Sequence, residues 1–109
     1  MLVDQERALR ELNIPEKMFK DLLQVFIEQV QESLDKLDGA LSRRDYDEIR
    51  KTAHFIHGSS GNLRIEKIRE SARNIEMDAL EKRDVATMEK HVHELKCIFN
   101  DVKKEVLYG

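Results

Sequence analysis

The stretch FKDLLQVFIEQVQESLDKLDGAL, residues 19–41, decides the fold of this chain. Its apolar residues recur at every third or fourth position, which is the period of one face of an α-helix. Because the face continues through the whole stretch, it predicts a long amphipathic helix with one buried side. The predicted core positions are Phe19, Leu22, Leu23, Phe26, Val30, Leu34, Leu37 and Leu41.

The segment before this helix indicates where it begins. Asn13-Ile14-Pro15-Glu16 has the pattern of a capping box with proline inside the first turn, so we expect the long helix to start there. Residues 4–11 predict a short leading helix, with Asp4 as its cap and Leu9 and Leu12 as its anchors.

Three further helical stripes follow the first. Asp45 with Glu48 marks the start of the next helix, and Gly61-Asn62 should end it, because both residue types accept left-handed backbone angles. Asp84, after Lys82-Arg83, should cap the last helix. The predicted buried positions are Tyr46, Ile49, Ala53, Ile56, Ser60 and Leu63, then Ile65, Ile68, Ala72, Ile75 and Ala79, and finally Val85, Met88, Val92, Leu95, Phe99, Val102 and Val106.

Four amphipathic helices with short connections favour an all-α fold, an antiparallel up-and-down four-helix bundle with a short additional N-terminal helix. The length of 109 residues suits one domain over residues 1–109. A monomer is the simple expectation, because the four stripes can bury one another.

Composition excludes several classes of function. Charged residues make up 38% of the chain, yet the net charge is only -3, which argues against a nucleic-acid surface or a polybasic membrane anchor. The single cysteine, Cys97, excludes an internal disulfide, and no apolar run approaches the roughly 20 residues of a membrane span. There is no secretory signal pattern, so we expect a soluble, cytoplasmic protein.

His54 is the most informative residue. At about 100° per residue it lies roughly 130° from the centre of the buried stripe of its helix, so it should face water. Gly58 lies on the same side one turn later, at a cost of about 1 kcal/mol relative to alanine, and leaves the imidazole open to a large partner. Arg50, Lys51 and His57 surround this surface and can neutralise an anion carried on His54. The arrangement points to a nucleophilic histidine that takes a phosphoryl group.

An apolar strip beside this surface predicts a docking site. Met18 and Val25, with Ile14, lie on the outer side of the first long helix, and Phe55 is off the buried face of the next one. The alternative is that Ile14 and Met18 pack beneath the short leading helix.

The remaining polar candidates are better explained by structure than by chemistry. Ser59 and Ser60 should bond to backbone carbonyls one turn back. His91 and His93 diverge on a helix, and His93 with Cys97 supplies only two ligands on one face. The sequence therefore predicts no metal site.

The run from His54 to Leu63 resembles the motif of histidine-containing phosphotransfer (HPt) domains, in which the acceptor histidine is followed by x-x-Lys-Gly-Ser-Ser/Ala-x-x-Leu-Gly. The matching residues are His54, Gly58, Ser59, Ser60 and Leu63, and the resemblance extends to residues 23–27, 44–46 and 74–76. Two positions depart from the motif. His57 stands at the usual lysine, and Arg64 stands at the usual glycine, which suggests that Gly61 or Asn62 makes the turn.

The resemblance implies a phosphorelay intermediate. Such a protein accepts a phosphoryl group from the aspartyl phosphate of one receiver domain and passes it to the aspartate of another. The implied partners are response-regulator receiver domains and a hybrid sensor kinase, and the receiver is expected to bring Mg²⁺, so this chain needs no cofactor of its own. In this family the receiver is held between the acceptor helix and the long helix before it, which agrees with the apolar strip. The expected contact residues are Met18, Val25, Phe55, Gly58 and Gly61.

No nucleotide-binding motif is present, so we expect a phosphocarrier without autokinase activity rather than an enzyme. Two other functions stay open at this point. One is an interaction module that binds receivers without carrying phosphate, and the other is a metal-binding helical bundle that uses the histidines.

Overall fold

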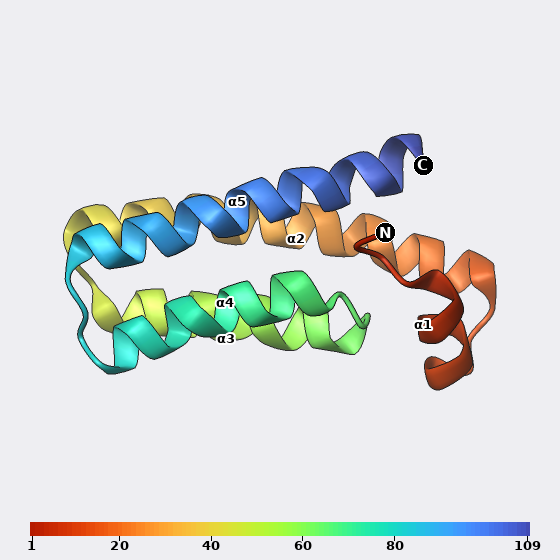
Figure 1. Ribbon diagram of the computed structural model, residues 1–109, viewed down its shortest axis with the longest axis horizontal. Coiled ribbons are helices and arrows are strands. Elements are labelled where there is room, and N and C mark those ends of the chain that lie inside the picture. The colour runs from red at the N-terminus through yellow and green to blue at the C-terminus, as the bar shows by residue number, and fades with distance from the viewer.

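The computed structural model describes residues 1–109 and contains five helices without strands. They are α1 (Gln5–Leu12), α2 (Glu16–Arg43), α3 (Tyr46–Asn62), α4 (Glu66–Leu80) and α5 (Val85–Tyr108). The predicted all-α bundle with a short leading helix is confirmed. In Figure 1, α2 and α4 run one way along the long axis, α3 and α5 run the other way, and α1 lies across one end.

The core lies where the apolar faces of the four long helices meet. Each of these helices contacts its neighbour in the chain, and α2 also contacts α5, which closes the bundle. A cluster of 24 buried apolar residues fills the interior. Its largest completely buried side chains include Phe19 on α2 and Phe99 on α5. Tyr46, Val85 and Val106, which were predicted to be buried, are only partly buried at the edge of this core.

Leu22 is a correction to the predicted core, because 40% of it is exposed. Its neighbour Leu23 is 5% exposed. Two adjacent residues on a helix point about 100° apart, so α2 turns Leu23 inward and leaves Leu22 beside α3 at the surface.

Side-chain caps fix three of the helix starts as predicted. Asp4 accepts a hydrogen bond from the backbone N–H of Arg7 (3.1 Å), Asp45 from Glu48 (3.1 Å) and Asp84 from Thr87 (3.3 Å). Each carboxylate satisfies an N–H group that has no partner within the helix. Asp84 consequently has a lowered pKa, caused first by its hydrogen bond with Thr87.

Asn13 does not cap α2, contrary to expectation. It ends α1 instead, with a left-handed φ of 53°, and its N–H donates to the carbonyl of Leu9. Pro15 occupies the position before α2 and makes no side-chain cap. Asparagine serves at either end of a helix, and here the short α1 takes it as its C-terminal residue.

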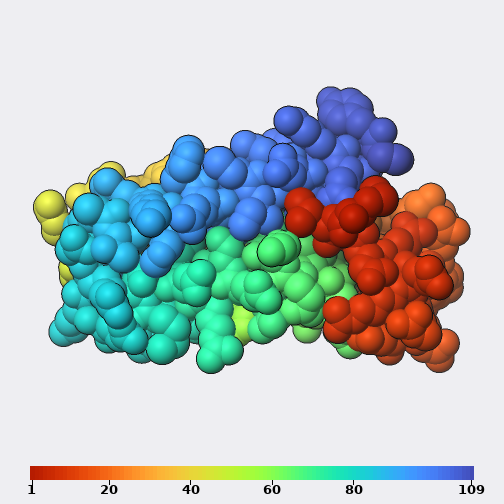
Figure 2. Space-filling view, in the orientation of Figure 1, coloured from red at the N-terminus to blue at the C-terminus, as the bar shows by residue number.

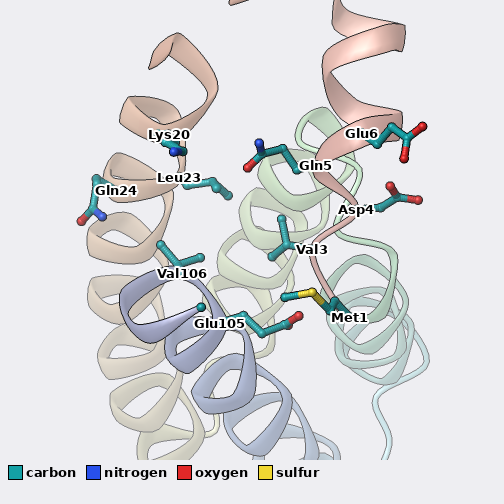
Figure 3. Close-up of a pocket in the computed structure, with 11 residues that line it drawn as sticks. Met1, Val3, Asp4, Gln5, Glu6, Lys20, Leu23, Gln24, Glu105 and Val106 are labelled. Atoms are coloured by element: carbon teal, nitrogen blue, oxygen red, sulfur yellow. The ribbon is translucent and has the colours of Figure 1, made fainter. Parts of the chain in front are cut away.

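Residues 1–12 cover the end of the bundle where α3 turns into α4. Figure 2 shows these red residues against the start of α4 and the end of α5. The N–H of Leu2 donates to both carboxylate oxygens of Glu105 (2.8 and 3.0 Å), and Arg7 pairs with Glu66 (3.7 Å). A cavity of about 650 Å³ remains between this segment, α2 and α5, and none of the predicted site residues lines it (Figure 3).

None of the five helices combines the length and apolarity needed to cross a membrane.

Candidate functional site

The imidazole of His54 projects from the middle of α3, with 67% of its side chain exposed. Its Nδ1 lies 2.5 Å from Oε2 of Glu76 on α4. The second oxygen of the same carboxylate, Oε1, lies 3.1 Å from Nδ1 of His57. One carboxylate from α4 therefore holds two imidazoles from successive turns of α3.

Small buried residues allow the backbones of α3 and α4 to approach one another. Ala53 and Ser60 on α3 and Ala72 on α4 are completely buried, and these two helices have the most extensive contact of any pair. Glu76 follows the buried Ile75, which places its side chain at the rim of the α3–α4 contact with 14% exposure. Close backbones and a rim position together bring the carboxylate within reach of both rings.

The carboxylate determines which nitrogen of each ring carries the proton. A carboxylate oxygen only accepts hydrogen bonds, so both rings are assigned as Nδ1–H donors. Nε2 of His54 is then left with its lone pair. Glu76 thus fixes both the orientation of the exposed imidazole and the nitrogen that is nucleophilic.

Gly58 leaves the surface beside His54 open. A Cβ built at this glycine would meet no atom within 4 Å, so no packing requires its absence. Behind it, Ser60 is buried and donates to the carbonyl oxygens of Ile56 (2.6 Å) and His57 (3.1 Å). Ser60 is structural, as predicted. At Gly58, by contrast, a side chain would make no contact with the rest of the fold.

The two predicted cations are held by another residue of α3. Arg50 and Lys51 each pair with Asp47 at 3.0 Å. Their hydrogen bonds, that of Lys51 first, lower the pKa of Asp47. Both cations therefore lie on α3 before His54, and the contacts that they make are with a carboxylate of their own helix.

Arg64, not Gly61 or Asn62, makes the left-handed turn after α3, which corrects the prediction. Helix α3 continues through Asn62, and Arg64 has a φ of 61°. The turn closes with the N–H of Ile65 donating to the carbonyl of Ser60 (2.9 Å). Arg64 tolerates this angle, which costs roughly 1 kcal/mol, while its guanidinium donates to the carbonyls of Gly61 (3.1 Å) and Asn62 (3.2 Å) and to Glu11 (2.8 Å).

The predicted apolar strip is exposed between α2 and α3. Met18 is 49% exposed, Val25 47% and Phe55 44%, and Leu22 joins them. Ile14 does not belong to the free strip, because it is half-buried against the core. Two hollows follow the line between α2 and α3, and Gln29 lines both. The more apolar one is lined by Leu12, Ile14, Leu22, Val25, Phe26, Gln29, Ser59, Asn62 and Leu63.

The other histidines lie on α5, away from this site. His91 is hydrogen-bonded to the buried Asp78 of α4. His93 is exposed, and its Nε2 lies 3.6 Å from the sulfur of Cys97. Neither pair includes a third ligand.

Glu76 is the site residue that sequence reasoning missed. It lies 22 residues from His54, and its spacing on α4 does not distinguish it from the other carboxylates of that helix. The one sequence signal was that the resemblance to HPt domains includes residues 74–76. Only the packing of α4 on α3 reveals its role.

Comparison with known proteins agrees with this geometry. A family model described as Hpt domain matches residues 21–104. The chain is also 30% identical over 57 residues to the phosphorelay intermediate protein YPD1 of Candida albicans, which covers 52% of this chain and 31% of that protein. The match thus spans less than a third of that relative's length, and no solved structure matches the chain. Because the family model covers more than half of the sequence, including His54 and Glu76, the chain belongs to the Hpt domain family.

Proposed function

We propose that this chain is a phosphorelay intermediate that accepts a phosphoryl group on Nε2 of His54 from a receiver-domain aspartyl phosphate. It then passes the group to the aspartate of another response-regulator receiver. The observation that carries the proposal is the exposed imidazole of His54. It lies beside the open surface at Gly58, and its Nδ1 is hydrogen-bonded to Glu76. The Hpt family match and the similarity to the phosphorelay intermediate protein YPD1 support the same role.

The chemistry needs no further group on this chain to activate the nucleophile. The lone pair of Nε2 attacks phosphorus in line with the acyl phosphate, a P–N bond forms, and the P–O bond to the receiver aspartate breaks with its electron pair on the leaving carboxylate. The ring keeps its Nδ1 proton and becomes a phosphorylated imidazolium. The carboxylate of Glu76 balances that positive charge, and the reverse attack by another aspartate restores the neutral ring.

Charge on the transferred group would be neutralised mainly by the partner, which we expect to bring Mg²⁺ and its own catalytic side chains. Arg50 and Lys51 would add positive charge if they left Asp47, and His57 would add it only when protonated. These three residues remain the proposed phosphate environment together with Gly58.

The receiver would dock along α2 and α3. The exposed Met18, Leu22, Val25 and Phe55 provide an apolar contact surface, and Gly58 leaves the neighbouring surface of α3 open. Gly61 is a further proposed contact residue, and it lies beside Arg69 of α4, whose side chain would be 3.3 Å from an added Cβ. Receivers of response regulators and of a hybrid sensor kinase are the proposed partners. No phosphate would be taken directly from ATP, and one monomer would serve each transfer.

Transfer is tested by incubating the purified chain with a ³²P-phosphorylated receiver. The expected product is an acid-labile, base-stable label on the wild type that is lost in His54→Gln and kept in the control His93→Gln, an exposed histidine of α5. Absence of label from the wild type with a full set of receivers from the source organism would refute the proposal. Retained receiver binding would then indicate an interaction module without transfer.

A further inference from the structure

His54, His57 and Glu76 form the one group of three potential metal-ligating side chains in this chain. One ligand atom from each lies within 4.8 Å of the other two. The two nitrogens already contact the two oxygens of the carboxylate, at 2.5 and 3.1 Å. This is a constellation of two imidazoles and a carboxylate at the surface of the bundle.

We propose that these three residues bind a divalent transition-metal ion, with Zn²⁺ as the representative, and that the bound ion prevents His54 from accepting a phosphoryl group. Two histidines and one glutamate with a fourth position open to water form an established type of zinc ligand set. Imidazole nitrogen favours zinc, copper and nickel over magnesium, which prefers oxygen ligands. The site would therefore discriminate against the Mg²⁺ that a receiver uses.

Binding requires the two imidazole rings to move relative to Glu76. A tetrahedral zinc ion at 2.0–2.1 Å from each ligand needs ligand atoms roughly 3.3 Å apart. Nδ1 of His57 lies 3.1 Å from Oε1 of Glu76, which is near that separation. Nδ1 of His54 lies 2.5 Å from the other oxygen, Oε2, so this contact must lengthen to admit an ion, and the two rings must come closer together. The rings meet edge to face, with centroids 6.0 Å apart. His54 can rotate to close the gap, because 67% of its side chain is exposed.

His57 is what distinguishes this site from the motif that the chain resembles. The motif has lysine at this position, and an ammonium group has no lone pair to offer a metal. The departure that weakens the fixed positive charge near His54 therefore supplies a third ligand.

The effect on phosphotransfer follows from the tautomer. A metal ion on Nδ1 occupies its lone pair, so the ring proton moves through solvent to Nε2. Nε2 of His54 then carries a hydrogen and has no lone pair with which to attack phosphorus. This consequence rests on the proposed phosphotransfer function, whereas metal binding itself does not.

Binding is tested first with ZnCl₂ alone. The background protein carries His93→Gln and Cys97→Ser, because that exposed pair (3.6 Å) would otherwise compete for zinc. Titration calorimetry should give one saturable site, and long-range ¹H–¹⁵N spectra should show the ring nitrogens of His54 and His57 changing together. His57→Gln and Glu76→Gln should each weaken binding at least tenfold, whereas Glu70→Gln, an exposed carboxylate on the same helix as Glu76, should not. Absence of saturable binding, or equal affinity in His57→Gln, would overturn the site.

Inhibition is tested with the phosphorylated receiver at a fixed Mg²⁺ concentration. Zinc should suppress labelling of His54 at concentrations that fill the site, and EDTA should restore it. Each variant is compared with its own zinc-free rate, and His57→Gln should need at least tenfold more zinc for the same suppression. Because the receiver is identical in both reactions, this comparison separates the effect from loss of Mg²⁺ by the receiver.

The two proposals fail in different ways. Labelling that persists unchanged when the site is saturated with zinc would overturn the inhibition and leave the phosphotransfer function intact. Zinc binding as described, with no receiver able to label His54 in either condition, would refute the phosphotransfer function and leave the metal site standing.

Discussion

Glu76 orients the imidazole of His54, although that side chain is exposed. A side chain as exposed as His54 is normally free to rotate, and either ring nitrogen can carry its proton. The contact of Nδ1 with Glu76 at 2.5 Å restricts both freedoms. His57 shares the carboxylate at 3.1 Å and keeps its second oxygen occupied. The nitrogen of His54 that keeps its lone pair, Nε2, is therefore determined by a residue on a different helix.

Replacing Glu76 should change both the tautomer of His54 and the rate of phosphoryl transfer. In Glu76→Ala, His54 loses its acceptor, and we expect phosphoryl transfer to slow by about tenfold, which corresponds to about 1.4 kcal/mol for a hydrogen bond to a charged group. Glu76→Gln keeps an oxygen acceptor and should recover part of the rate. Single-turnover labelling gives the rate, and ¹⁵N spectra of the ring give the fraction of Nδ1–H. Unchanged tautomer and rate in Glu76→Ala would show that Glu76 does not position His54, and Glu70→Gln is the matched control.

At the scale of the element, α3 uses one side for packing in the core and the other side to leave His54 accessible to a partner. One side of the helix is buried through Ile49, Ala53, Ile56 and Ser60. The other side carries His54 and then Gly58, where an added Cβ meets nothing within 4 Å. A glycine in such a place lowers helix stability without any gain in packing. The gain is an open approach to the imidazole.

Two substitutions at Gly58 should separate its effect on the stability of the fold from its effect on the rate of phosphoryl transfer. Gly58→Ala should raise the free energy of unfolding by about 1 kcal/mol, because alanine has the higher helix propensity and its methyl group meets no neighbour. Gly58→Arg should also fold, yet it should slow transfer severely by obstructing the receiver. Urea unfolding and single-turnover labelling measure the two effects. Transfer at the wild-type rate in Gly58→Arg would show that the open surface is unnecessary.

The elements were predictable where the determinants are local. The apolar period located every helix, and Asp4, Asp45 and Asp84 marked three starts correctly because a cap is a contact between residues close in sequence. Asn13 was misassigned because it suits either end of a helix. Gly61-Asn62 was misassigned because Arg64 adopts the left-handed angle with its own side chain bonded to the turn.

Tertiary packing decided the features that the sequence left open. Leu22 and Leu23 both fit the apolar period, and only the position of α3 shows which one is exposed. His54 and Gly58 were predictable as an exposed pair on one helix. Glu76 was not, since its contact with His54 depends on how closely α4 packs on α3.

At the scale of the whole molecule, Glu11 connects α1 to the turn between α3 and α4. Its carboxylate accepts from Arg64 (2.8 Å) and from Arg7 (3.0 Å), and Arg7 also reaches Glu66 on α4. Hydrogen bonds from Arg64 first and Arg7 second hold the pKa of Glu11 below its ordinary value of 4.5. The short leading helix is thus attached to the bundle partly through a charged contact that depends on pH.

This attachment should weaken in acid. The pKa of Glu11 is lower in the folded chain than in the unfolded one, so its contribution is complete above about pH 4.5 and is lost as the pH falls through that value and below. Asp47 and Asp84 also have lowered pKa values, so their contributions to the stability of the fold are likewise lost as the pH falls from about 3.8 downward. We therefore expect the free energy of unfolding, measured in urea, to decrease as the pH is lowered over this interval. Glu11→Gln should flatten the fall, whereas Glu70→Gln should leave it unchanged. An equal slope in Glu11→Gln and the wild type would mean that the Glu11 contacts do not hold α1 in solution, since removing a carboxylate whose charge stabilises the fold must remove its share of the acid sensitivity.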